Sequence, residues 1–509
     1  MLGKVYGVTL RGINGYMVQV EADISDGLPS FDMVGIPGSE VKEARERVRT
    51  AFHNCGISLP PKRITINLSP ADLRKRGSGL DLPIAVSILT ALGYFTGALW
   101  NSIVENSLFC GELSLDGKLC SIHGVLPAVL CAREHHVRTC FIPADNVAEA
   151  ACIEGIDVIP LHSLMDLFEL TASEDRLAKA VVPHIPWKEA DCVYETDFCE
   201  VNGQTAARRA IEVAVAGMHN LLLSGPPGSG KSMLARRIPS IMPPLSYEES
   251  VEITKIYSIC GLLKPGSGLL KSRPFRSPHH TASTTALSGG GLYPTPGEIS
   301  LADRGVLFLD ELPEFSRRTL EVLRQPMEDQ MVQISRLNGR YDFPAHTMIC
   351  AAMNPCPCGY WPDPVRCTCT GHGVKKYRNR ISGPLLDRID IHMEVLPLSK
   401  EDLLTVSSDN ESSETIRKRI LEVHKVQMQR FQGTGIFFNS QMSSSMVRDF
   451  CPLHPDARSC LNTYLDKNTL TTRGYYRLLK TARTIADLDH SDEILVSHLM
   501  EAYCYRASE

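Results

Sequence analysis

The sequence predicts a multidomain α/β protein: an α+β domain, then a parallel sheet carrying a phosphate-binding loop, then helices. Three observations lead to this prediction. The 509 residues are too many for one hydrophobic core. The mixture of strand-like and helix-like segments changes along the chain. Finally, the glycine-rich stretch GPPGSGKS follows the apolar run NLLLS and precedes a helical stretch, as in nucleotide-binding sheets.

Composition argues against a membrane-spanning protein and against a generally basic nucleic-acid-binding protein. Hydrophobic residues make up 43% and charged residues 22% of the chain, which is typical of a globular protein. No run approaches the roughly 20 apolar residues that cross a bilayer, so we expect a soluble cytoplasmic protein. The net charge of −5 requires any nucleic-acid contact to come from local basic patches. In a cytosolic protein, the 17 cysteines indicate buried thiols or a metal site.

Four segments are expected in order. Residues 1–170 alternate strand-like runs such as RITINL with helical stretches such as EVKEARERVRTAFHNCG, which predicts the α+β domain. Residues 171–200 are mixed and charged and read as a linker. Residues 201–395 alternate helices and strands around the phosphate loop, which predicts a parallel sheet. Residues 396–509 show helical spacing, as in ETIRKRILEVHKVQMQRF.

The phosphate loop fits the pattern G-x-x-x-x-G-K-[ST]. Its backbone N–H groups can surround phosphate oxygens at a helix N-terminus. Lys231 is expected to reach the β and γ phosphates of ATP, and the Ser232 hydroxyl to coordinate Mg²⁺. The alternative is a glycine-rich turn without a ligand. The predicted loop consists of Gly225, Pro226, Pro227, Gly228, Ser229, Gly230, Lys231 and Ser232.

Two later strands end in polar residues. GVLFLDELPEF places Asp310 and Glu311 after an apolar run, so that Asp310 can face the magnesium ion and Glu311 can polarise an attacking water. TMICAAMNP ends in Asn354, which suits a contact with that water or the γ-phosphate; the alternative is an ordinary strand-end turn. Three arginines follow, and arginine suits the charge that develops on a transferred phosphoryl group. They are Arg378, Arg380 and Arg388.

The core also carries two expected insertions. Asp310 follows Lys231 by 79 positions, and residues 273–297 within this span are rich in Gly, Ser, Thr and Pro, which favours a ligand-binding loop or an exposed surface lid. QMVQISRLNGRYDFPA predicts a hairpin around Asn338-Gly339. Arg336 and Arg340 flank this turn and suit a grip on a DNA backbone, or else serve solubility alone.

A cysteine cluster follows Asn354. Thiolates are soft ligands, and four of them at loop spacing can enclose a tetrahedral zinc ion that orders a proline-rich segment. The alternative is four free thiols. The cluster consists of Cys356, Cys358, Cys367 and Cys369, spaced as C-x-C, eight residues and C-x-C.

In this order, the phosphate loop, LFLDE, MNP and SGPLLDRID resemble AAA+ ATPases, especially the ATPase subunit of magnesium chelatase. Over nearly its full length the chain resembles the YifB/ComM family, whose competence member is a DNA helicase acting in branch migration. The resemblance implies that Gly225–Ser232 is the Walker A motif, and that Asp310 with Glu311 forms Walker B. It implies a helix-2 insert at 273–297, a pre-sensor-1 hairpin and a helical lid. The implied roles of single residues are sensor 1 for Asn354, arginine finger for Arg388 with Arg380 in reserve, and sensor 2 for Arg473.

The N-terminal segment resembles the Lon protease domain. The resemblance rests on SPADLRKRGSGLDLPIAVSIL and CGELSLDGKLCSIHGVLPAVLCAREHHVRTCFIPADN. In that family a serine and a lysine form a catalytic dyad. Ser78 matches the serine, but Leu126 stands near the place of the lysine and cannot accept a proton. We therefore expect a protease-like fold without peptidase activity.

Three functions compete. The first is an ATP-driven motor that forms a hexamer and acts on single-stranded or branched DNA in recombination or natural transformation. It would contact the DNA through Arg336, Arg340 and residues 273–297. The second is a chelatase-type or chaperone-type ATPase that remodels a protein partner. The third is a regulatory module in which hydrolysis times assembly. The Lon-like segment and the cysteine cluster depart from the magnesium chelatase subunit.

Overall fold

The protein consists of two compact units that exchange a stretch of chain. The computed structural model describes residues 2–188, 194–336, 339–397, 410–467 and 471–506. The first unit holds residues 1–189 and 246–270, and the second holds 190–245 and 271–509. The chain therefore leaves the first unit inside the segment expected to be a linker, and later returns to it. Along the described residues, no helix combines the length and apolar composition that crossing a bilayer requires.

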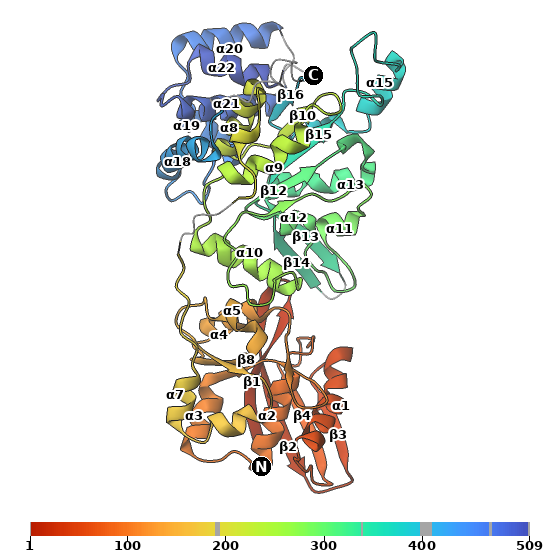
Figure 1. Ribbon diagram of the computed structural model, residues 1–509, viewed down its shortest axis with the longest axis vertical. Helices are drawn as coiled ribbons and strands as arrows, with labels where there is room; N and C mark the ends of the chain where they lie inside the picture. Colours follow the sequence, from red (N-terminus) through yellow and green to blue (C-terminus); the bar gives the residue numbers. More distant parts are fainter. Residues whose placement is uncertain (1, 189–193, 337–338, 398–409, 468–470, 507–509) are drawn as a thin grey trace. The chain divides into compact units, whose positions relative to one another are not determined.

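The first unit is built on a mixed seven-stranded sheet (Figure 1). β1 (Leu2–Arg11) and β2 (Asn14–Ser25) form a long antiparallel hairpin because Gly12 turns the chain with a φ of 63°. The sheet order is β3-β4-β2-β1-β5-β8-β9. The remaining strands are β3 (Ser30–Val34), β4 (Arg63–Ser69), β5 (Ser107–Phe109), β8 (Thr139–Pro143) and β9 (Asp157–Leu161).

Helices cover this sheet with apolar faces. α1 (Ser39–Asn54) buries Val41, Ala44, Val48, Ala51 and Phe52, which recur at three- and four-residue intervals. α2 (Asp81–Ala91) is buried along almost its whole length. α4 (Val125–Glu134) buries a continuous apolar run beside the strands. The α+β domain expected from the sequence therefore consists of a sheet with packed helices.

Part of the long span between Lys231 and Asp310 belongs to this first unit. α10 (Tyr247–Ile259) begins with a capping box, in which Ser246 and Glu249 satisfy each other's backbone N–H groups. The helix packs beside α4, and Leu269 at the end of the segment is buried in the same apolar cluster. The Ser258 hydroxyl donates to the buried carboxylate of Glu149 at 2.6 Å. Residues 246–270 of the span thus form one helix and an irregular stretch that returns to the same apolar cluster.

The second unit contains the predicted parallel sheet. Its order is β11-β12-β15-β10-β16, and every described pair is parallel. The strands β10, β12 and β15 consist almost entirely of buried apolar residues, as expected when helices cover both faces of a sheet. The strands are β10 (Leu221–Ser224), β11 (Phe275–Arg276), β12 (Val306–Leu309), β15 (Met348–Met353) and β16 (Ile391–Glu394).

The C-terminal helices share a core with this sheet. Residues from α8 (Thr205–Gly217), the strands and the last helices form one apolar cluster. Arg477 of α21 donates to the buried carboxylate of Asp390 at 2.6 Å, which ties this helix to the turn before β16. The C-terminal helices are α18 (Ser413–Arg430), α19 (Ser444–Phe450), α20 (Pro455–Lys467), α21 (Thr472–Leu488) and α22 (Val496–Cys504).

Candidate nucleotide site and basic surfaces

The phosphate loop lies between β10 and α9 (Lys231–Ile241). Gly228 and Gly230 adopt φ values of 76° and 93°, a region that favours glycine, and the turn at Gly230 starts the helix at Lys231. A Cβ on Gly225 would lie 2.2 Å from the carbonyl oxygen of Val395. The loop therefore needs these glycines to pass close to β16 and to turn its N–H groups toward a ligand.

The carboxyl ends of the central strands bring the other expected residues to this loop. Asp310 follows β12 and Asn354 follows β15, and these neighbouring strands run parallel. The Ser232 hydroxyl donates to the Asp310 carboxylate at 2.7 Å. The Lys231 amine donates to the Asn354 side-chain oxygen at 3.2 Å. Four residues predicted from separate stretches of sequence therefore form one connected cluster.

The cluster has the features that a triphosphate with a metal ion requires. The Lys231 amine also donates to the carbonyls of Gly225 and Pro226 at 2.8 and 2.9 Å, contacts that phosphate oxygens can replace. Burial lowers the pKa of Lys231, opposed by the charge of Asp310. Within the described residues, the buried Ser229 hydroxyl has no hydrogen-bond partner. Ser232 and Asp310 offer the two oxygen ligands that suit Mg²⁺.

Glu311 is held by a residue of the 273–297 insert. Its backbone adopts a left-handed conformation with φ 51° and ψ 47°, uncommon for a residue with a side chain. Its carboxylate lies 3.1 Å from Nδ1 of His280, and 56% of the side chain is exposed. His280 belongs to the stretch 273–297, whose composition predicts only a ligand-binding loop or an exposed lid. No local pattern reveals its contact with Glu311, because the two residues are 31 positions apart.

The two arginines expected to sense the nucleotide share one acidic partner. Arg388 contacts the Glu328 carboxylate at 2.8 Å, and Arg473 at the start of α21 pairs with the same oxygen. Arg388 also donates to the carbonyl of Pro384 at 2.6 Å. Burial and the nearby Arg324 lower the pKa of Arg388. Among the described contacts, neither guanidinium bonds to the phosphate loop of its own chain. Arg380, the reserve candidate, instead pairs with Glu314 at 2.7 Å.

The predicted hairpin is present and lies beside the insert. β13 (Met331–Arg336) and β14 (Gly339–Pro344) pair in antiparallel register, with Arg336 opposite Gly339. The turn residues 337 and 338 lie outside the described residues. Arg336 donates to the carbonyl of Gly291 in the insert at 3.3 Å, and Arg340 pairs with Asp342 at 3.1 Å. Both side chains are exposed.

Other basic residues of the insert serve the fold. Arg273 is 6% exposed, and its guanidinium donates to the carbonyls of Pro243, Pro244 and Arg304. Arg276 forms a bidentate pair with Glu298, with both distances 2.7 Å. Arg273 is therefore too buried to take part in the DNA contact expected of residues 273–297. The part of the insert near the hairpin is its glycine-rich stretch at Gly290 and Gly291.

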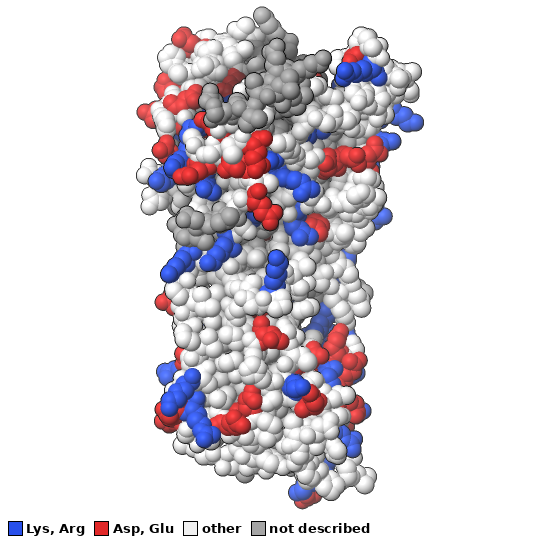
Figure 2. All heavy atoms as spheres, in the orientation of Figure 1, with Lys and Arg blue, Asp and Glu red and all other residues white. Residues whose placement is uncertain are grey.

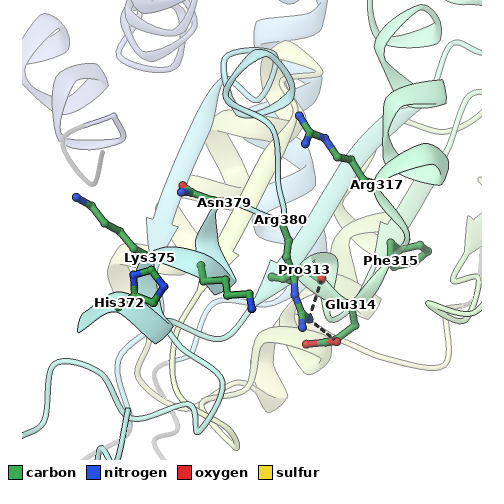
Figure 3. A pocket seen from close by; sticks show the side chains of 9 residues that line it. Pro313, Glu314, Phe315, Arg317, His372, Lys375, Asn379 and Arg380 are labelled. Carbon is green, nitrogen blue, oxygen red and sulfur yellow. Dashed lines mark hydrogen bonds and ion pairs between the residues drawn. The ribbon is translucent and has the colours of Figure 1, made fainter. Parts of the chain in front are cut away.

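A basic pocket opens beside the loop that follows Glu311. On the face drawn in Figure 2, Lys and Arg are interspersed with Asp and Glu, so a concentration of positive charge is a local feature. The pocket has a volume of about 800 Å³ and is lined by Glu314, Arg317, His372, Lys375, Lys376 and Arg380, among others. In Figure 3, Arg380 bonds to Pro313 and Glu314. Within the described part of the chain, Arg317, Lys375 and Lys376 have no acidic partner.

The sequence singles out Arg380 but does not predict this pocket. Lys375 and Lys376 lie on α15 (Gly371–Arg378), directly after the cysteine cluster, and both are exposed. Arg317 starts α13 (Arg317–Glu321), 58 positions earlier. The only sequence signal is the KKYRNR run, which is too short to predict that a distant arginine joins it.

The structure brings the four predicted cysteines together and shows the surroundings of the two positions compared with the Lon dyad. The sulfur atoms of Cys356, Cys358, Cys367 and Cys369 lie within 4.8 Å of one another. Ser78 is half-buried in the loop before α2, while Leu126 in the first turn of α4 is fully buried. Leu126 offers no proton acceptor, and its own N–H donates to Glu149 at 3.2 Å.

Comparisons with known proteins agree with this architecture. Residues 197–403 match the family described as magnesium chelatase, subunit ChlI, residues 20–146 match subunit ChlI of Mg-chelatase, and residues 410–506 match the ChlI C-terminal family. The competence protein ComM of Haemophilus influenzae is 40% identical, over 99% of this chain and 97% of its own length. YifB of Escherichia coli, an uncharacterized protein, is 41% identical over 99% of this chain and 97% of its own length.

A more distant relative matches only part of the chain. The DNA replication licensing factor MCM4 of Oryza sativa is 26% identical over 52% of this chain and 26% of its own length. The near full-length relatives, the three matched families and the parallel sheet with its phosphate loop all point to the same assignment. The chain belongs to the YifB/ComM family of magnesium-chelatase-like AAA+ ATPases.

Proposed function

We propose that this protein is an ATP-hydrolysing motor that acts on single-stranded or branched DNA as a ring, with a hexamer as the expected assembly. The observation that carries the proposal is the connected cluster of Lys231, Ser232, Asp310 and Asn354 at the strand ends, in the unit that also carries an arginine-bearing hairpin. One relative is named a DNA replication licensing factor and another a competence protein, names that are consistent with the proposal. The process served would be recombination or natural transformation.

In hydrolysis, each residue of the cluster has a separate task. Lys231 and the loop N–H groups would hold the β and γ phosphates, and Ser232 and Asp310 would hold Mg²⁺, which neutralises charge on the phosphates. Glu311 would accept a proton from the attacking water. Asn354 would orient that water through its amide. The products are ADP and phosphate, and the proton leaves through the exposed carboxylate of Glu311.

The arginine pair supports a ring. Arg388 and Arg473 are held together by Glu328 and do not bond to their own phosphate loop. A neighbouring subunit would present its nucleotide to these arginines, so each site would be completed in trans. Such a head-to-tail contact repeats around a closed ring. On ATP binding, the two arginines would leave Glu328 and bind the γ-phosphate of the neighbouring subunit. The nucleotide state would then control the contact between subunits.

DNA would be held by the hairpin and the neighbouring part of the insert. Arg336 and Arg340 would contact phosphates, and Gly290 and Gly291 beside them would let the backbone approach the strand closely. The unpaired cations of the basic pocket offer a second phosphate contact in the same unit. The N-terminal segment would be a Lon-like domain without peptidase activity that acts as a scaffold, because Leu126 cannot serve as the base for Ser78.

A second candidate is a chelatase-type or chaperone-type ATPase that remodels a protein partner, which the family descriptions favour. ATP turnover measured with and without single-stranded and branched DNA, at low and moderate salt, separates the two, with Glu311→Gln as the blank. Stimulation that weakens with salt and vanishes in the blank supports the motor. Turnover that is indifferent to DNA refutes it and favours the remodelling ATPase. The other cofactor proposed is a structural Zn²⁺ at the four cysteines.

A further inference from the structure

The four cysteines after Asn354 have the geometry of a metal site. The Sγ atom of Cys356 lies 3.3 Å from that of Cys358 and 3.8 Å from that of Cys367, and the Cys358 and Cys367 sulfurs are 3.5 Å apart. Zinc–sulfur bonds of about 2.3 Å in a tetrahedron place the sulfurs about 3.8 Å apart. A disulfide requires about 2.05 Å. The observed separations therefore suit four thiolates around one ion.

Burial does not explain why this segment is ordered. From Trp361 to Thr370 no residue is buried, and the side chain of Val365 is 90% exposed. The stretch between β15 and α15 contains no helix or strand, and four prolines limit its backbone hydrogen bonding. A segment with this composition cannot be held by an apolar core of its own, whereas a metal ion supplies such order directly.

The surroundings of the sulfurs also fit thiolates. The backbone N–H of Trp361 points to the Cys356 sulfur at an N–S distance of 3.4 Å, so that a donor faces a sulfur that would carry negative charge. Cys356 itself is fully buried directly after Pro355. Four soft sulfur ligands without a carboxylate among them select zinc or an iron–sulfur centre over magnesium or calcium.

The same segment packs on the phosphate loop. Gly359 lies between the first two cysteines and the rest of the segment with a φ of 88°, and a Cβ there would lie 2.5 Å from Cδ of Pro227. The carbonyl of Pro355 accepts from Arg378 at 3.3 Å, which anchors the other side of the segment. Asn354, just before the segment, accepts from Lys231. The cysteine segment therefore contacts the phosphate loop directly at Pro227 and indirectly through Asn354.

We infer that Cys356, Cys358, Cys367 and Cys369 bind one Zn²⁺ and that the bound ion braces the phosphate loop by holding Gly359 against Pro227. Loss of the ion would release the loop and weaken nucleotide binding. The bracing rests on the proposed function, since it assumes that the loop binds ATP. The metal site itself does not depend on that assumption.

Metal analysis of the full-length chain tests the first half. Elemental analysis after dialysis, with release of zinc by a thiol reagent, is expected to give one zinc per chain in the wild type and in Cys504→Ser, which alters an exposed cysteine far along the sequence. Cys367→Ser is expected to lose at least about nine-tenths of the zinc. Undiminished zinc in Cys367→Ser, iron in place of zinc, or a wild type without metal overturns the assignment.

Binding of a fluorescent ATP analogue in the Glu311→Gln background tests the bracing. Cys367→Ser is expected to weaken binding by about 5-fold or more, with the remaining fold checked by circular dichroism. Gly359→Ala keeps all four cysteines, so it is expected to keep its zinc and still weaken binding, because its methyl group meets Pro227. Full affinity in the zinc-retaining Gly359→Ala protein overturns the bracing, even if Cys367→Ser fails to fold. A wild type with one zinc and no ATP binding instead refutes the proposed function and leaves the metal site standing.

Discussion

Removal of the His280 side chain is expected to raise ATP turnover in the absence of DNA. In the structure His280 lies 3.1 Å from the Glu311 carboxylate, which would act as the base toward water. A carboxylate engaged by an imidazole is less available to accept a proton. His280→Ala would leave Glu311 free more of the time and so increase basal turnover.

The size of the effect follows from exposure of the pair. The His280 and Glu311 side chains are 30% and 56% exposed, so the interaction is screened by water. Such pairs contribute about 0.2 to 1 kcal/mol. Since 1.36 kcal/mol corresponds to a tenfold change in rate, basal turnover should rise between about 1.4-fold and 5-fold. The ratio of turnover with DNA to basal turnover should fall by the same factor. His280 lies on the insert proposed to contact DNA, so bound DNA would already free Glu311 in the wild type.

Steady-state turnover with and without DNA measures this effect, and the chain offers a matched control. His279 packs against His280 in a tilted arrangement, with ring centroids 4.1 Å apart, but among the described contacts it bonds to Thr281 and not to Glu311. His279→Ala should therefore leave basal turnover near that of the wild type. If His280→Ala lowers basal turnover, or leaves it unchanged with full nucleotide affinity, the contact does not restrain Glu311 and the reasoning fails.

Three further outcomes follow from the proposed contacts. Arg388→Ala should lower kcat by about 10³-fold with little change in ATP affinity, and mixing it with subunits that cannot bind nucleotide should restore part of the activity; no restoration argues against action in trans. Arg340→Glu should reduce DNA-stimulated turnover and leave basal turnover intact, while Arg45→Glu on the first unit should change neither; equal stimulation in both variants contradicts the hairpin assignment. The Lys375→Glu, Lys376→Glu double variant should weaken single-stranded DNA binding and lower the slope of log affinity against log salt by about 1.4; an unchanged slope excludes the basic pocket as a contact.

The nucleotide site and the hairpin could both be predicted because each of their parts has a local signature. The glycine spacing around Lys231, the apolar runs before Asp310 and Asn354 and the Asn338-Gly339 turn are all visible within short windows. Parallel pairing then places the strand ends together without further information. The hairpin predicted from the turn is present in the structure as β13 and β14.

Contacts between distant segments could not be predicted in this way. Composition suggested an exposed loop from Arg273 onward, but three backbone carbonyls hold that guanidinium inside the fold. The shared partner Glu328 lies on a short helix that the sequence analysis did not single out, 60 positions from Arg388 and 145 from Arg473. Tertiary packing decides such pairs, and a single sequence contains no period or spacing that reports them.

Residues 246–270 belong to the first unit although the sequence on both sides of them belongs to the second, so the units are not separate modules along the chain. The polypeptide crosses between the two units at residues 189, 245 and 270, so the ATPase unit is not a continuous cassette. A fragment that begins near residue 200 would retain α10 but lack α4, and would leave the apolar residues Val251 and Leu269 exposed to water. Neither a single protease cut nor a single gene fusion can separate or exchange the units cleanly. The two units therefore have to be engineered together.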